Sequence, residues 1–415
     1  MIAYERTILD NGLTVLVHQD VATPMVTVNV LYNVGARDED ANKTGFAHLF
    51  EHLMFGGSMN IPEYDEPLQM AGGDNNAFTT NDITNYYCTL PVQNIETALW
   101  LESDRMLSLA FSKKSLEVQR KVVCEEFKEH YINKPYGDVW HKMRKLAYTT
   151  HPYRWMTIGS ELSHVENATL DDVKNFFAKH YTPCNAILVI AGNIDAATAV
   201  PLVNKWFGNI PSGTKYVRNL PTEPPQTEAR KLVIKANVPI DALYKCWHIY
   251  PRLDDRYYVA DLITEVLSGG GSSRLHQALV KEQQLFSNID CYHTGTTDAG
   301  LLTISGKLVV GVTMEQAEAA LAIEIQKMQT TLIADAELEK IKNKTESIIA
   351  FEDISIGSRA TSLAMYEALG DANMMNTELT KYQAVTAQQI KDECNIIFAT
   401  HNCNTIHYMS ELVQG

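Results

Sequence analysis

Two histidines and a glutamate lie close together in the segment His48-Leu49-Phe50-Glu51-His52. If this segment is helical, His48 and His52 lie one turn apart on the same face, so both imidazoles can bind one metal ion. Glu51 then lies beside a third coordination position, where a catalytic site holds water. Chance would produce this HxxEH spacing about 0.03 times in a chain of this composition. The segment therefore predicts a metal site, with a solvated helix face bearing two histidines as the alternative.

A catalytic zinc site usually takes three ligands from the protein, so a third ligand is expected from another element. The stretch 113–131 predicts a helix with an apolar stripe formed by Leu116, Val123 and Phe127. Glu126 lies about 60° from the centre of this stripe, and Glu125 lies about 160° from it. We therefore expect Glu126 to face inward as the third ligand and Glu125 to face solvent. A surface acid is the alternative for each.

The elements that would position these residues follow from hydrophobic period and turn signals. Residues 4–34 predict three strands, the first two joined by a hairpin turn at Asp10-Asn11-Gly12. A polar strand is expected after the loop 72–74, and a further strand over 185–191. The helical period recurs over 44–55, 95–111, 113–131 and 169–180. A long helical tract is expected over about 335–370, with Asp335 as its N-cap.

The two halves of the chain carry matching features. Thr169 and Thr386, which are 386 − 169 = 217 residues apart, each open a predicted helix with a capping box and precede a strand. Four prolines in residues 211–225 mark a boundary. The prediction is an α+β fold of two homologous domains, each a mostly antiparallel sheet packed with helices. Its parts are a zinc-binding catalytic domain (1–213), a linker (214–228) and a domain without metal ligands (229–415). Two unrelated α+β domains are the alternative.

Composition limits the classes of partner. The chain has 415 residues, with 35 Lys and Arg against 50 Asp and Glu, so its net charge is −15. This charge argues against nucleic acid or an anionic membrane as the main partner. The seven cysteines are scattered without a CxxC pair, which predicts reduced, mostly buried thiols. Because no signal peptide is visible, a cytoplasmic protein is expected, or a periplasmic one if a leader has been removed.

The combination of motifs resembles a known family, the inverzincin zinc metallopeptidases that include pitrilysin, insulin-degrading enzyme and the mitochondrial processing peptidase. The resemblance begins at the HxxEH segment and runs through most of the chain in family order. The further motifs that carry it are Asn76-Ala77 with Tyr86-Tyr87, Gln119 to Glu126, His151 to Trp155 with Ile158-Gly159-Ser160, and Gly269 to Leu275.

The resemblance implies a function and a role for each matching residue. It implies that His48, His52 and Glu126 bind Zn²⁺ and that Glu51 is the general base. It also implies that an edge strand binds substrate through Asn76, Ala77, Phe78 and Thr79. The expected protein is a zinc-dependent endopeptidase subunit that hydrolyses unfolded peptides or short polypeptides. A noncatalytic assembly subunit of the same fold is the alternative.

Two positions depart from the family pattern. Members usually carry an Arg and, seven residues later, a Tyr that bind substrate, but Val280 and Ser287 occupy these positions here. In the repeat register, His48, Glu51 and His52 correspond to Leu262, Glu265 and Val266 of the second half, so the second half is expected to have no metal site of its own. The resemblance therefore implies half of a four-domain chamber. We expect a heterodimer in which a related subunit supplies the Arg and Tyr, with a homodimer as the weaker alternative.

Overall fold

The computed structural model describes residues 1–412, which form two compact units. The first unit comprises Met1–Lys128, Trp155–Leu220 and Ala350–Thr377. The second unit comprises Glu129–Arg154, Pro221–Ile349 and the residues from Glu378 onward. The units therefore interleave in sequence. The proposed division of the chain at a linker over 214–228 describes the sequence repeat and stays a prediction.

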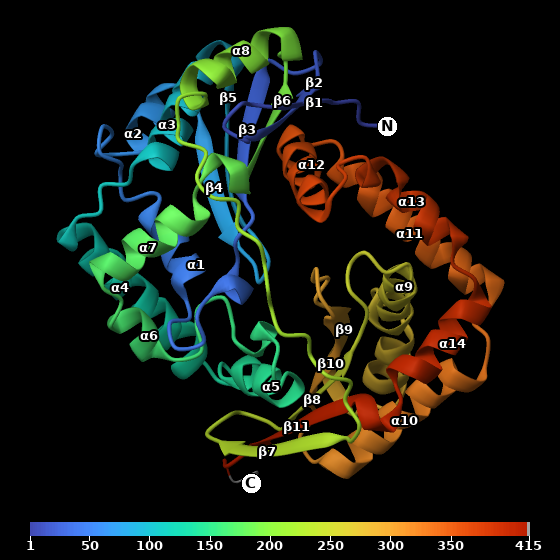
Figure 1. Cartoon of the computed structure of the whole chain (residues 1–415). Helices are drawn as coiled ribbons and strands as arrows, with labels where there is room; N and C mark the ends of the chain where they lie inside the picture. Colours follow the sequence, from blue (N-terminus) through green and yellow to red (C-terminus); the bar gives the residue numbers. More distant parts are fainter. Residues whose placement is uncertain (413–415) are drawn as a thin grey trace. The chain divides into compact units, whose positions relative to one another are not determined.

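The first unit is built on a six-stranded sheet with the order β1-β2-β6-β3-β5-β4 (Figure 1). Strands β2 and β6 are parallel, and the other neighbours are antiparallel. The predicted hairpin turn lies between β1 and β2, where Gly12 adopts a φ of 87°. The strands are β1 (Glu5–Ile8), β2 (Thr14–Gln19), β3 (Met25–Tyr32), β4 (Asp74–Thr79), β5 (Thr84–Pro91) and β6 (Ala186–Gly192).

Helices cover both faces of this sheet. On one face, α12 packs its small residues Ala360 and Ala364 against β3 and β6, whereas α3 and α8 pack against the opposite face (Figure 1). The helices wholly within the unit are α1 (Phe46–Leu53), α2 (Asp65–Met70), α3 (Ile95–Leu107), α4 (Lys113–Phe127), α6 (Leu162–Glu166), α7 (Leu170–His180), α8 (Ala196–Phe207) and α12 (Ile356–Leu369).

The second unit is built on a five-stranded sheet with the order β7-β11-β8-β10-β9. Its strands are β7 (Arg230–Ala236), β8 (Ala242–His248), β9 (Phe286–His293), β10 (Leu301–Leu308) and β11 (Cys403–Ser410). Its helices are α5 (Val139–Ala147), α9 (Arg256–Ser268), α10 (Met314–Thr330) and α14 (Ala387–Ile397). Two more helices, α11 (Asp335–Glu352) and α13 (Met374–Ala384), run across the unit boundaries.

Short helical turns complete the described elements. Five are 3₁₀ turns, at Ala36–Asp38, Val92–Asn94, Pro152–Arg154, Pro183–Asn185 and Thr400–Asn402. Two are π-helical, at Lys128–Ile132 and His276–Glu282.

The two sheets share one topology. The order β2-β6-β3-β5-β4 of the first corresponds to β7-β11-β8-β10-β9 of the second, and in both the first pair is parallel and every later pair antiparallel. Both predicted capping boxes are also present, Thr169 with Asp172 and Thr386 with Gln389. The predicted α+β fold with two related halves is therefore confirmed.

The predicted helical tract over 335–370 was wrong in two details. It is two helices, because the chain leaves the helix after Glu352 and Ser355 caps a new one by accepting a hydrogen bond from the Ser358 N–H. Asp335 is the first residue of α11 rather than its N-cap. The break lets α12 pack on the first sheet.

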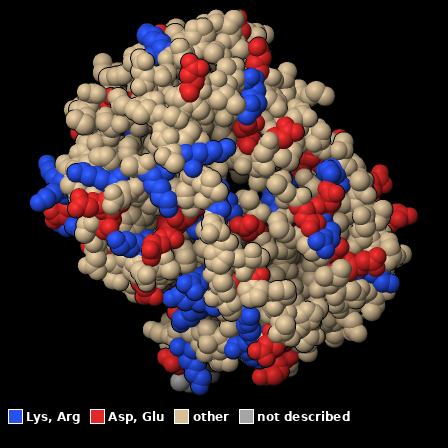
Figure 2. All heavy atoms as spheres, viewed as in Figure 1, with Lys and Arg blue, Asp and Glu red and all other residues tan. Residues whose placement is uncertain are grey.

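The cysteines and the surface charges agree with the composition of the chain. No disulfide joins the seven cysteines, and all except Cys184 are buried. On the face drawn in Figure 2, acidic and basic side chains are interspersed, without a broad basic patch. Among residues 1–412, no helix combines the length and the apolar character needed to cross a bilayer.

Candidate metal centre

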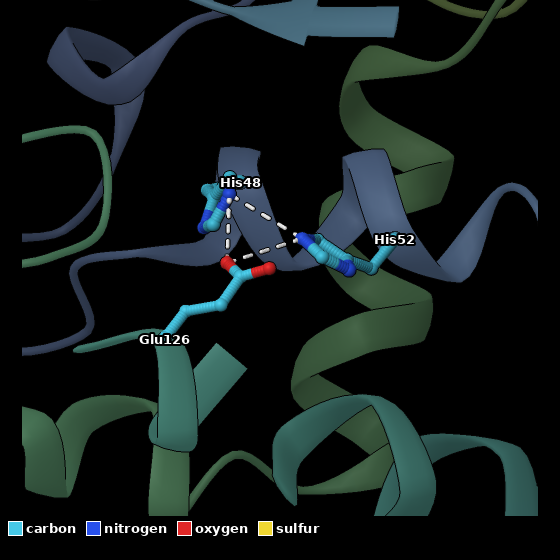
Figure 3. Close-up of side chains that lie close together, drawn as sticks. All are labelled: His48, His52 and Glu126. Carbon is cyan, nitrogen blue, oxygen red and sulfur yellow. Dashed lines mark hydrogen bonds and ion pairs between the residues drawn. The ribbon is translucent and has the colours of Figure 1, made fainter. Parts of the chain in front are cut away.

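Helix α1 brings two imidazoles together. Its apolar side is buried, and Phe50 stacks on Tyr181 at a ring separation of 4.9 Å. The opposite side presents His48 and His52, whose Nε2 atoms lie 3.4 Å apart (Figure 3). Their side chains are 17% and 20% exposed. The helical spacing therefore points both nitrogens at one position that solvent can reach.

A carboxylate from α4 completes the cluster. The Oε2 atom of Glu126 lies 3.6 Å from the Nε2 atom of His48 and 3.6 Å from that of His52 (Figure 3). Its neighbour Glu125 points away from the histidines, is 72% exposed and pairs with Lys128. The apolar stripe of α4 causes this difference, because Val123 and Phe127 turn one carboxylate inward and leave the other in solvent.

The cluster has the dimensions of a zinc site. With Zn–N and Zn–O bonds of about 2.0–2.1 Å and tetrahedral angles, two ligand atoms lie about 3.4 Å apart. The observed separations are 3.4, 3.6 and 3.6 Å. Burial lowers the pKa of His48 to about 4, and the nearby His52 adds to this effect. His48 is therefore neutral near pH 7, as a metal ligand must be. The residues present fit a zinc ion.

Glu51 lies next to the cluster on α1, one residue before His52. Burial raises the pKa of its carboxyl group above the usual value. The hydroxyl and backbone of Thr79, at the end of β4, oppose this rise because they favour the charged form. A carboxylate beside a metal position is suited to accept a proton from water and to return it.

Strand β4 is the open edge of the first sheet. It pairs with β5 on one side only, and no strand of the described residues covers its other side. Along that side, the Ala77 N–H donates a hydrogen bond to the Asn76 Oδ1 atom at 2.8 Å, and the Thr79 backbone interacts with Glu51. The residues expected to bind substrate, Asn76, Ala77, Phe78 and Thr79, all lie on this strand. Helix α1 packs against the same strand. The edge and the histidine cluster are therefore neighbours.

The two faces of β4 have different surroundings. Thr79 approaches Glu51, whereas Phe78 packs on the opposite face with the cluster that includes α12. On that face, Phe78, Tyr87 and the start of α12 line a cavity of about 510 Å³. No sequence pattern predicts this cavity, because α12 comes from a distant part of the chain.

The second unit contains no corresponding metal cluster among the described residues. Leu262 and Val266, at the positions of the histidines in the repeat, are fully buried in its core, and Glu265 pairs with Lys344. Val280 packs against this same core. Ser287 is exposed, and its hydroxyl donates a hydrogen bond to the backbone oxygen of Lys307.

Comparisons with known proteins agree with this architecture. The protein-family model described as insulinase (peptidase family M16) matches residues 14–154. The family model described as the peptidase M16 inactive domain matches residues 167–345. The chain is 30% identical over 353 residues to zinc protease PqqE of Helicobacter pylori (strain ATCC 700392 / 26695), covering 82% of this chain and 78% of that protein. It is 28% identical over 212 residues to the mitochondrial-processing peptidase subunit beta of Saccharomyces cerevisiae (strain ATCC 204508 / S288c), covering 50% and 48% of the two chains.

A solved structure of a protease from Helicobacter pylori superposes with a TM-score of 0.92 at 26% identity, covering 98% of this chain and 100% of that one. Two related α+β halves and relatives named zinc proteases define the class of protein. The chain belongs to peptidase family M16, the insulinase family. The family resemblance inferred from the motifs is thereby confirmed.

Proposed function

We propose that this chain is a zinc-dependent endopeptidase subunit. The observation that carries the proposal is the cluster of His48, His52 and Glu126, with ligand separations of 3.4 to 3.6 Å and Glu51 beside it. An ordinary surface with two histidines and an acid has no reason to converge on tetrahedral dimensions. The relatives named zinc proteases support the same reading.

The chemistry divides among four residues. His48, His52 and Glu126 hold the metal, and a bound zinc ion would supply Lewis acidity, lowering the pKa of a water ligand and polarising the scissile carbonyl. Glu51 accepts the proton of the attacking water and then donates it to the departing amine. Beside these four residues, Thr79 favours the charged form of Glu51.

The substrate is an unfolded peptide or a short polypeptide in extended conformation. Strand β4 is an edge of the sheet that no described strand covers, and only a segment without its own strand partners can pair with it. In such a strand, alternate side chains point to opposite faces. One set approaches α1, and the other approaches the cavity beside Phe78.

The complete enzyme needs a second subunit. Val280 has no hydrogen-bond donor in its side chain, and Ser287 is short, so neither can bind substrate as an Arg and a Tyr would. A related chain that carries these two residues would complete the site, and one relative is itself named a subunit. A homodimer is the weaker alternative. The unpaired cysteines favour a reducing compartment such as the cytoplasm.

A noncatalytic assembly subunit is the second candidate. The description "inactive domain" for the model that matches residues 167–345 favours it for that half of the chain. In the first half, the complete ligand set and Glu51 favour catalysis. We therefore propose that the first half of the chain bears the catalytic site and that the second half serves in subunit assembly.

Metal analysis and a peptidase assay test the proposal. The purified chain should contain about one zinc per molecule, cleave a quenched fluorescent peptide weakly or not at all alone, and gain activity with its partner. Glu51→Gln should bind zinc and stay inactive in both settings. A chain that binds no zinc would overturn the peptidase assignment, whereas full activity of the chain alone would overturn only the need for a partner.

A further inference from the structure

The amino-terminal end of α1 is held by a carboxylate that lies outside the helix. The Oε2 atom of Glu39 accepts a hydrogen bond from the Gly45 N–H at 2.9 Å, and its Oε1 atom accepts one from the Ala47 N–H at 2.8 Å. Glu39 is 8% exposed. Both oxygens of a buried side chain are therefore committed to the first turn of the helix that carries the metal-binding histidines.

The helix has no cap of its own. The residue at its N-cap position, Gly45, has no side chain, and no acidic residue lies in the first turn. The preceding Thr44 directs its hydroxyl elsewhere, to His164 at 2.8 Å and to the Ser160 N–H at 2.7 Å. Because the first N–H groups of a helix lack partners within it, Glu39 supplies what a capping side chain would.

The backbone at the start of α1 is also fixed. Gly45 has a φ of 89°, and a Cβ atom there would lie 2.6 Å from the backbone oxygen of Ile158. The chain thus enters the helix along one path. Glu39 binds the amides on both sides of Phe46, and His48 follows Ala47 directly. The Glu39 side chain therefore binds the backbone of α1 directly before the first ligand.

The orientation of α1 depends on such outside contacts because the helix is short. With eight residues it is only about 12 Å long, and helices of this length are marginal without external contacts. Metal sites require ligand distances within about 0.2 Å of their ideal values. Glu126 comes from another helix, so its distance to the two histidines depends on how α1 is held.

We propose that Glu39 is a positioning residue for the metal centre: by binding the amides of Gly45 and Ala47, it orients α1 so that His48 and His52 meet Glu126. This inference rests on the proposed zinc peptidase function. Glu39 touches neither metal nor substrate, so its effect passes entirely through the geometry of the helix.

Metal affinity of the folded protein gives the test. Glu39→Ala should weaken zinc binding about 10- to 100-fold in competition with a chelator, the range typical for groups that orient ligands. It should also change the visible absorption of the cobalt-substituted protein, which reports ligand geometry. Glu39→Gln keeps one acceptor oxygen, so it should fold and lose less affinity. For peptide cleavage with the partner, kcat should fall while KM stays nearly constant.

A matched control removes an acidic cap from another helix of the same unit. Asp195 caps α8 by accepting a hydrogen bond from the Thr198 N–H. Asp195→Ala should lower the melting temperature without changing zinc affinity or the cobalt spectrum. The positioning role is overturned if Glu39→Ala binds zinc as tightly as the unmodified chain. Where Glu39→Ala does not fold, the same criterion applies to Glu39→Gln. In either case the proposed function stands. An unmodified chain that binds no zinc overturns both.

Discussion

The Oε2 atom of Glu126 lies 3.6 Å from the Nε2 atom of His52, although the two residues belong to different helices. The adjacent carboxylate of Glu125 points into solvent and pairs with Lys128. One helix thus offers two carboxylates of the same chemistry, of which only one faces the histidines. This pair allows the proposed metal site to be tested with an internal control.

Glu126→Gln should reduce zinc affinity by at least about tenfold, because a neutral amide replaces an anionic ligand. The measurement is competition for zinc against a chromophoric chelator at neutral pH. Glu125→Gln, one position earlier on the same helix, should bind zinc as the unmodified chain does. Equal losses in the two variants would contradict the ligand assignment.

Glu51→Gln should separate metal binding from catalysis. The amide cannot accept the proton of water, so cleavage of a quenched peptide by the assembled enzyme should fall by about 10²- to 10⁴-fold. The zinc content should remain about one per chain, since Glu51 is not a ligand in the proposed site. A variant that kept its zinc and its activity would remove Glu51 from the mechanism.

Removing one partner of the buried ion pair between Glu102 and Arg105 should strongly destabilise the first unit. Arg105 is 2% exposed, forms a forked pair with Glu102, and stacks between Tyr64 and Tyr86 with its Cζ atom 4.6 and 4.4 Å from their ring centroids. Glu102→Gln leaves a buried guanidinium without its counter-ion, which should cost about 3–5 kcal/mol. Chemical denaturation measures this loss.

The comparison for that experiment is an exposed ion pair on the same unit. Glu96 pairs with Lys205 at 2.7 Å, and its side chain is 42% exposed. Glu96→Gln should change the free energy of unfolding by no more than about 1 kcal/mol, because solvent screens the pair. A similar cost for Glu96→Gln and Glu102→Gln would show that burial is not the deciding factor.

His180 should make the first unit sensitive to acid. Its ring is fully buried and has no hydrogen-bond partner among residues 1–412, and burial lowers its pKa from 6.5 to about 3. The unfolded chain therefore takes up a proton as the pH falls below 6.5, whereas the folded chain stays neutral down to about pH 3. Stability is fully present above pH 6.5 and declines from there downward, by about 2 kcal/mol at pH 5.

Replacing the histidine should remove this pH dependence. His180→Phe should be relatively more stable at pH 5 than at pH 7.5 when both are compared with the unmodified chain by denaturant titration. Phe176 packs against the His180 ring at 4.7 Å. Phe176→Leu, which alters packing without removing a titrating group, should cost the same at both pH values. A pH-independent effect of His180→Phe would contradict the lowered pKa.

Local sequence patterns were enough to predict much of the metal site and of the elements around it. The helical period alone put His48 and His52 on one face, because residues four apart in a helix always share a side. The apolar stripe of α4 likewise separated Glu126 from Glu125. Turn chemistry and capping boxes predicted the strands and helices that frame these residues, and the motifs together identified the family.

Packing between distant segments decided the rest. Nothing in the sequence around Thr79 indicates its approach to Glu51, and nothing around Glu39 shows that its carboxylate binds the first turn of α1. The break after Glu352 that lets α12 pack on the first sheet was also missed. The hydrophobic periodicity of a segment determines only which face of its helix or strand each residue occupies. Which element packs against that face depends on the folding of the whole chain. The hydrogen bonds and apolar contacts that join distant segments leave no periodic signal in the local sequence.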